Sequence, residues 1–328
     1  MIGKVFKAKD GRNLSIDLIK IIAMLGVISL HCNMDRLDNM VAFVISRIAG
    51  ISIPLFFMVS GYLLLEKGGD WRYSFKKIFG IIKFVFLCSL IFSFFYVIAH
   101  QQFNINVLGI FLRSFIQKGP LWMFWYFGAM CLLYMLLPIL KWADKRWDFF
   151  YPKLFACLLC ADFVVFIVTF ACRWEYNVIQ SFRLWNWLTY FSLGSIIHKY
   201  QIHVPVSAFV VMFSGLFFVM FVYYSRLYID GIEYFFTTPL CMLYATLFFV
   251  KITSMQIQNN LFVSRLSDLF LPVYTIHYFV VKAFHNMITS QYIGIWTPLF
   301  DYLAIAIITL LVCNVIMQVP LAKRFFRI

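Results

Sequence analysis

The chain alternates long apolar stretches with short polar connections over almost its whole length. An α-helix rises 1.5 Å per residue, so about 20 apolar residues cross the hydrocarbon core of a bilayer. Stretches of roughly that length can be marked ten times, at 14–32, 41–65, 78–99, 121–140, 154–172, 184–200, 205–225, 234–250, 269–288 and 297–319. The pattern predicts an all-α protein, a polytopic membrane bundle of about ten transmembrane helices that forms a single domain over residues 1–328.

The composition supports this prediction. Apolar and aromatic residues make up 63% of the chain and charged residues only 13%, whereas ordinary globular domains are about half apolar and a quarter charged. A soluble fold of this length could not bury that excess, so the composition excludes a soluble enzyme, a disordered chain and a disulfide scaffold. Cys157 and Cys160 form a CxxC, but it lies inside an apolar stretch without a further His or Cys cluster, and no HxxxH or HxxE occurs, so no metal site is predicted.

The distribution of basic residues predicts the orientation. With the N-terminus inside, the inner connections hold eighteen of the twenty-eight Lys and Arg residues and the outer loops hold six, while four lie within spans. Because cytoplasmic connections are enriched in Lys and Arg, both termini are expected to be cytoplasmic. The basic residues form no patch on a soluble face, so the net charge of +14 does not indicate a nucleic-acid partner.

The first span carries three ionisable residues on one helical stripe: Asp17, Lys20 and His31. Charged groups inside a bilayer are costly, which makes them candidates for function. Asp17 and Lys20 lie near the inner end and His31 about 16 Å further along. Two alternatives remain open: Asp17 and Lys20 form a surface pair with Lys20 reaching the headgroups, and His31 is an interfacial residue. Histidine is also the side chain best suited to general-base catalysis near neutral pH.

Polar residues also interrupt the second and ninth spans. Arg47 lies next to an apolar run and, because it cannot lose its proton, needs an anion or carbonyl groups. Ser60 and Gly61 form a small pair that allows helices to approach closely. Tyr274 and His277 lie one turn apart on the same face, where a buried histidine requires a partner. The available carboxylates are Asp17, Asp162, Asp268 and Asp301.

Five segments together resemble the membrane acyltransferase-3 family, in the order found there. They are RNLSIDLIKIIAMLGVISLH (12–31), SRIAGISIPLFFMVSGYLL (46–64), GPLWMFWYFGAMCLLYMLLPIL (119–140), TYFSLG (189–194) and LSDLFLPVYTIH (266–277). Within the family the chain is most similar to the compact ten-span O-acetyltransferases, such as the one that acts on enterobacterial common antigen.

The resemblance implies transfer of an acyl group, usually acetyl from acetyl-CoA, to a hydroxyl of a cell-surface glycan or its lipid-linked precursor. It also implies a multi-pass protein of the bacterial inner (cytoplasmic) membrane that holds no tightly bound cofactor and has acetyl-CoA, a glycan and membrane lipid as partners. The essential histidine of the family falls on His31, as catalytic base or transient acyl carrier. The family's RxxR signature at the third span is incomplete here, since Arg72 is followed by Lys76 and Lys77 but the second Arg is absent.

Combined with this resemblance, the polar residues predict a donor site. The phosphates of CoA are anionic and cytoplasmic, so basic residues at the inner mouth are expected to receive them. The residues expected to bind the donor or to surround the reacting groups are Asp17, Lys20, Arg47, Arg72, Lys76, Lys77, Tyr274 and His277. Among them, Arg47 is the deeper partner for an anion and Tyr274 a candidate to stabilise the thioester oxyanion.

Two other classes of protein fit part of the pattern. A transporter or flippase for a lipid-linked sugar or an acyl donor also uses interrupted helices with charges near the midplane. A scaffold subunit of a polysaccharide assembly complex would be unaffected by His31→Ala. The chain shows no inverted repeat in its charges or in its Gly and Pro residues, which favours the enzyme.

Overall fold

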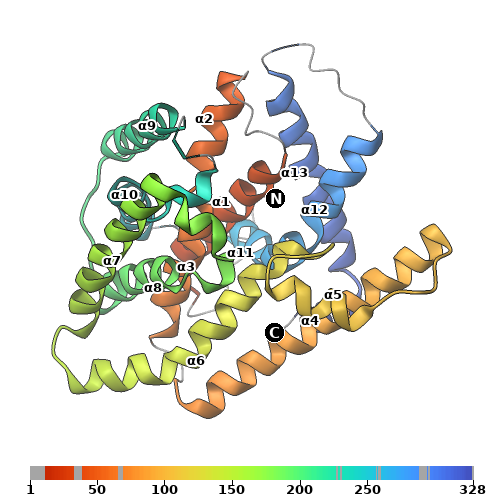
Figure 1. Cartoon of the computed structure of the whole chain (residues 1–328), viewed down its shortest axis with the longest axis horizontal. Helices are drawn as coiled ribbons and strands as arrows, with labels where there is room; N and C mark the ends of the chain where they lie inside the picture. The colour runs from red at the N-terminus through yellow and green to blue at the C-terminus, as the bar shows by residue number, and fades with distance from the viewer. Residues whose placement is uncertain are drawn as a thin grey trace, which may run out of the picture.

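The computed structural model describes residues 12–32, 39–65, 69–226, 228–229, 231–255, 257, 260–287, 294 and 296–326. Within these ranges the chain forms helices and no β-strand (Figure 1). The elements, with η for a 3-10 helix, are α1 (Leu14–His31), α2 (Met40–Ala49), α3 (Ser52–Leu64), α4 (Trp71–His100), α5 (Val107–Phe115), η1 (Trp122–Phe124), α6 (Trp125–Arg146), α7 (Phe150–Cys172), η2 (Trp174–Asn177), η3 (Gln180–Phe182), α8 (Leu184–Lys199), α9 (Ala208–Ser225), η4 (Ile232–Phe235), α10 (Pro239–Thr253), α11 (Leu261–Asp268), α12 (Phe270–Met287), α13 (Thr297–Ile316) and α14 (Pro320–Phe325). The predicted all-α fold is confirmed.

Each of the ten predicted spans coincides with helical structure. Seven segments of the described residues are long and apolar enough to cross a membrane: α1, α2 with α3, α4, η1 with α6, α7, α9 and α13. The other three, α8, α10 and α12, are shorter or carry more polar residues. The protein is therefore a polytopic helical membrane bundle. Lys4, Lys7 and Lys9, which contributed to the predicted orientation, lie outside the described residues.

Two helix breaks lie in or beside predicted spans. The second span breaks at Gly50 and Ile51 into α2 and α3, whereas the ninth is one helix, α12, with the short helix α11 directly before it. Pro54 and Pro272 each occupy the third position of the helix that follows the break. Proline lacks an N–H group and clashes with the carbonyl of the preceding turn, so it fits best in the first turn of a helix. The breaks therefore lie where the prolines favour the start of a new helix.

Helix α1 is the central element of the bundle. Asn13 caps its first turn by accepting hydrogen bonds from the backbone N–H groups of Ser15 and Ile16. The helix packs against α2, α3, α10, α11, α12 and α13. By contrast, no more than a third of the apolar stretch is buried in α4, α7, α9 and α13, as expected of helices that face lipid. Residues on α1 are thus shielded from lipid by the surrounding helices.

The closest helix crossing joins α3 and α8. The Cα of Gly61 lies directly against the carbonyl group of Phe191, and the Cα of Gly194 lies in the same way against the carbonyl of Met58. The hydroxyl of Ser195 donates a hydrogen bond of 3.2 Å to the carbonyl of Gly61. Small residues permit such backbone contact inside membranes, and the predicted packing role of Gly61 is confirmed.

Candidate active site

A cavity of about 200 Å³ lies at the His31 end of α1. It is lined by Val27, Leu30, His31, Ser46, Arg47, Ile53, Phe56, Gln117, Trp122, Met123, Trp125, Tyr126, Gln180, Ile232, Glu233, Phe236 and Tyr274. These residues come from α1, α2, α3, α6 and α12, from the 3-10 helices η1, η3 and η4, and, for Gln117 and Phe236, from the turns between elements. The cavity is therefore lined both by membrane helices and by the connections between them.

His31 lies in a cluster of rings. Its imidazole is 5.0 Å from that of His277, measured between centroids, and the two planes are tilted by 38°. Trp122 and Tyr278 contact the same ring edge-on at 5.3 and 5.8 Å. The structure thus brings the predicted catalytic residue together with His277, from the other end of the sequence.

His277 is fully buried and its ring orientation is fixed. The Nδ1 atom lies 3.0 Å from the carbonyl oxygen of Val273. A carbonyl only accepts, so Nδ1 carries the hydrogen and Nε2 of the neutral ring is left as an acceptor. Within the described part of the chain Nε2 has no hydrogen-bond partner. A backbone carbonyl, and not one of the four carboxylates considered from the sequence, orients this histidine.

Arg47 lies in the last turn of α2, just before the helix break, and is buried with 4% of its surface exposed. Its guanidinium carbon lies 4.7 Å from the centre of the Phe43 ring, one turn earlier on the same helix. Because Arg47 also lines the cavity, a permanent positive charge lies in the same space as His31.

Tyr274 joins α12 to the wall of the cavity. Its hydroxyl donates a hydrogen bond to the backbone carbonyl of Met123 in η1. A tyrosine hydroxyl has a single hydrogen to donate. In this structure the hydrogen is therefore directed at the backbone, away from any reacting oxygen.

Three polar residues of the cavity were not identified from the sequence: Gln117, Gln180 and Glu233. All three lie in connections between helices, where polar residues are usual and do not stand out. Trp122 and Trp125 lie within a segment quoted for the family resemblance, but no role was predicted for them. Gln117 has a positive φ of 59°, an uncommon backbone conformation that the sequence pattern does not reveal.

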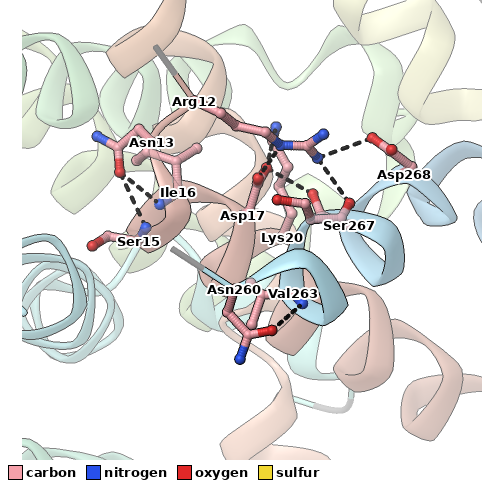
Figure 2. Close-up of polar contacts among 11 residues, drawn as sticks. Arg12, Asn13, Ser15, Ile16, Asp17, Lys20, Asn260, Val263, Ser267 and Asp268 are labelled. Carbon is pink, nitrogen blue, oxygen red and sulfur yellow. Dashed lines mark hydrogen bonds and ion pairs between the residues drawn. The ribbon is translucent and has the colours of Figure 1, made fainter. Parts of the chain in front are cut away.

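Asp17 and Lys20 lie at the opposite end of α1, in a polar network that Figure 2 shows. Asp17 is 2% exposed and accepts hydrogen bonds from Arg12 and from the hydroxyl of Ser267, the latter at 2.8 Å. The Lys20 ammonium lies 3.4 Å from the same carboxylate, and Arg12 also pairs with Asp268 at 2.9 Å.

This network ties the start of α1 to α11. Arg12 additionally donates a hydrogen bond of 3.0 Å to the carbonyl of Ser264. Burial lowers the pKa of the Arg12 guanidinium, but the hydrogen bonds and charges of Asp17 and Asp268 raise it overall, so Arg12 stays protonated. Asp17 is thus a buried member of a network and not one half of a surface pair.

The predicted cations of the third span lie at the start of α4, which packs against α5 and α6. Arg72 and Lys76 are exposed, and Lys77 is half-buried with its ammonium 6.0 Å from the centre of the Tyr73 ring. The side chain of Asp70 caps the helix. None of the three basic residues lines the cavity at His31. Among the residues that the structure describes, no group of three or more His, Cys, Asp or Glu side chains is placed to hold a metal ion.

Comparison with known proteins gives one match. A family model described as an acyltransferase domain, that of the membrane acyltransferase-3 group, covers residues 13–318. It includes α1 to α13 and every residue that lines the cavity. No curated protein and no solved structure shows significant similarity to the chain.

Proposed function

The chain belongs to the membrane acyltransferase-3 family and is a membrane-bound acyltransferase, and we propose that it is an O-acetyltransferase that uses acetyl-CoA. The acceptor in this proposal is a hydroxyl of a cell-surface polysaccharide or of its lipid-linked precursor, and the membrane is the bacterial inner membrane. Family membership favours the enzyme over the transporter and the scaffold subunit.

One observation carries the proposal. His31 lines a cavity that is also lined by the buried, positively charged Arg47, and the His31 ring packs against that of His277. Acyl transfer to an alcohol requires a base near the attacking hydroxyl and positive charge near the oxygen that becomes an oxyanion. In the proposed enzyme His31 is the base and Arg47 supplies the positive charge, and both residues line one cavity.

In the reaction, the hydroxyl oxygen of the acceptor attacks the thioester carbon. A C–O bond forms, the C–S bond breaks, and the hydroxyl proton passes to His31 and then to the CoA thiolate. Alternatively, the imidazole of His31 takes the acetyl group first and passes it to the acceptor in a second step. Both routes leave an acetyl ester and free CoA.

Arg47 is the better candidate for stabilising the oxyanion. The sequence suggested Tyr274 for this role, but its hydroxyl donates to the Met123 carbonyl and would first have to break that bond. The guanidinium of Arg47 has five N–H donors in a fixed plane and cannot lose its charge.

The donor would approach from the Leu14 end of α1, where Lys20 is held beside Asp17. The exposed charges of Arg72 and Lys76, together with Lys77, supply further cations for the CoA phosphates. The cavity of about 200 Å³ is smaller than typical small-molecule sites, so it has room for the reacting ends of both substrates but not for a whole CoA.

Two measurements test the proposal. The purified full-length protein, given acetyl-CoA labelled on the acetyl group, is expected to release CoA and to transfer label to envelope glycan. Cells that produce His31→Ala are expected to lack the O-acetyl signals that NMR detects on surface polysaccharide of cells with the native protein. His203→Ala, an exposed histidine outside the cavity, is the matched control. Equal ester content in native and His31→Ala cells would contradict the catalytic assignment.

A further inference from the structure

Gln180 is a buried polar residue, 7% exposed, that lines the space containing His31. Its amide Oε1 atom has no hydrogen-bond partner among the described residues. A buried acceptor without a donor is unfavourable, and native proteins rarely keep one unless a ligand or water satisfies it.

The backbone of Gln180 is fixed on both sides. Its N–H donates to Oε1 of Gln117 at 3.3 Å, and its carbonyl accepts from the indole of Trp187 at 2.6 Å. The Trp187 ring is fully buried and stacked on Phe57, with ring centroids 4.5 Å apart. The backbone that carries the side-chain amide is thus held in place before any ligand arrives, which lowers the entropic cost of binding.

The surrounding groups indicate which of the two substrates meets this amide. Gln117 and Glu233 lie on the same wall, and Trp122 and Trp125 present aromatic rings to the same cavity. Amides and a carboxylate accept hydrogen bonds from hydroxyl groups, and aromatic rings pack against the C–H faces of sugars. The carboxylate of Glu233 disfavours an anionic ligand at this place. The wall therefore suits a neutral, polyhydroxylated ring.

From these contacts we infer that Gln180 is the residue that positions the acceptor sugar, its Oε1 accepting a hydrogen bond from a hydroxyl next to the one that is acetylated. The inference rests on the proposed O-acetyltransferase function and assigns the wall formed by η3 and η4 to the acceptor. Gln117 supports it by holding the Gln180 backbone. His31 lines the same cavity, where it meets the neighbouring hydroxyl.

The test uses the full-length protein in lipid nanodiscs, with labelled acetyl-CoA as the donor. The acceptor probe is envelope polysaccharide from the source cells, freed of its esters with mild alkali. The variants are Gln180→Met, which keeps the length of the side chain but removes the amide, and Gln180→Asn, which draws the oxygen back. Gln102→Met, at an exposed position outside the cavity, is the control.

Gln180→Met is expected to lower kcat/KM for the polysaccharide about 10-fold, the effect of one lost hydrogen bond to a buried group. The KM for acetyl-CoA and the slow release of CoA without acceptor are expected to stay within twofold of native. Gln180→Asn is expected to lower kcat/KM for the polysaccharide by a smaller factor, again without a change in KM for acetyl-CoA. The control is expected to change neither value.

Other results overturn the inference. Native kcat/KM for the polysaccharide in both variants would show that Gln180 does not contact the acceptor. An equal loss in the reaction without acceptor would show a purely structural role. A native protein that neither releases CoA nor labels the polysaccharide would instead refute the proposed function, and this inference with it.

Discussion

The imidazole rings of His31 and His277 lie 5.0 Å apart although they belong to the first and twelfth α-helices of the chain. His277 is held by its bond to the Val273 carbonyl, so it forms a fixed surface against which His31 packs. The base of the proposed reaction therefore packs against a ring from another helix.

Removing the His277 ring is expected to slow the reaction. His277→Ala leaves space beside His31, so the imidazole of His31 can move out of position. A catalytic base displaced by about 1 Å lowers kcat about 100-fold. His277→Phe keeps a ring of similar size and is expected to retain most of the activity. Steady-state release of CoA in the presence of acceptor measures both variants. A Phe variant as inactive as the Ala variant would mean that a nitrogen of His277 is required.

The glycine contacts between α3 and α8 predict a sharp loss of stability. A methyl group at position 61 or 194 meets a backbone carbonyl of the opposite helix, which cannot move aside as a flexible side chain does. Gly61→Ala and Gly194→Ala are each expected to cost about 1–3 kcal/mol of folding free energy, as overpacking does. Gly294→Ala, where the added methyl meets no atom within 4 Å, is the control. Thermal unfolding in detergent gives the comparison, and unchanged midpoints for both α3–α8 variants would contradict the crossing.

The basic residues at the start of α4 predict an ionic-strength effect on the donor. The triple variant Arg72→Gln, Lys76→Gln, Lys77→Gln is expected to raise KM for acetyl-CoA several-fold at low salt, since exposed charges attract phosphates over about a Debye length. Salt is expected to raise the native KM toward that of the variant.

A control variant changes the exposed basic pair Lys323 and Arg324 to glutamine. Its KM for acetyl-CoA is expected to equal that of the native protein, because the position of the basic residues, and not the total charge, determines donor binding. A triple variant with native KM at every salt concentration would remove these residues from the donor site.

Glu175 predicts a dependence of stability on pH. The residue lies in η2, outside the spans, and is fully buried, where it accepts a hydrogen bond from Asn186 and pairs with Arg183 at 3.6 Å. Burial raises the pKa of Glu175 to about 7, although the charge of Arg183 lowers it in part. The folded protein thus keeps this proton at pH values where the unfolded chain, with a pKa near 4.5, has lost it.

A buried carboxyl group whose pKa is raised lowers the free energy of unfolding as the pH rises from about 4.5 to 7, and at higher pH this loss stays constant. For Glu175 the loss of stability is on the order of 3 kcal/mol. The unfolding midpoint of the native protein is expected to fall over this range, and that of Glu175→Gln to fall less because glutamine does not ionise. Parallel pH profiles for the two proteins would contradict this account.

The membrane helices and half of the site could be predicted from the sequence. Spans follow from apolar length alone, and His31, Arg47, Tyr274 and His277 stand out because each is a polar residue inside such a span. Their proximity could not be derived, since it depends on how α1, α2 and α12 pack.

The other half of the site is of a different kind. Gln117, Gln180 and Glu233 lie in connections, where a polar residue carries no signal, and 3-10 turns have no periodicity long enough to detect. The burial of Asp17 was also not predictable, because Arg12 and Ser267, which hold it, approach from a loop and from α11.

The elements that line the cavity differ in how freely they can change. The helices α1, α2 and α12 are fixed by packing among helices, whereas η3 and η4 belong to short connections outside the apolar spans. Substitutions or insertions in those connections can reshape the cavity at His31 without disturbing the helices that hold the histidine. For the proposed O-acetyltransferase, the acceptor can therefore change through these connections while the helices that carry the chemistry stay the same.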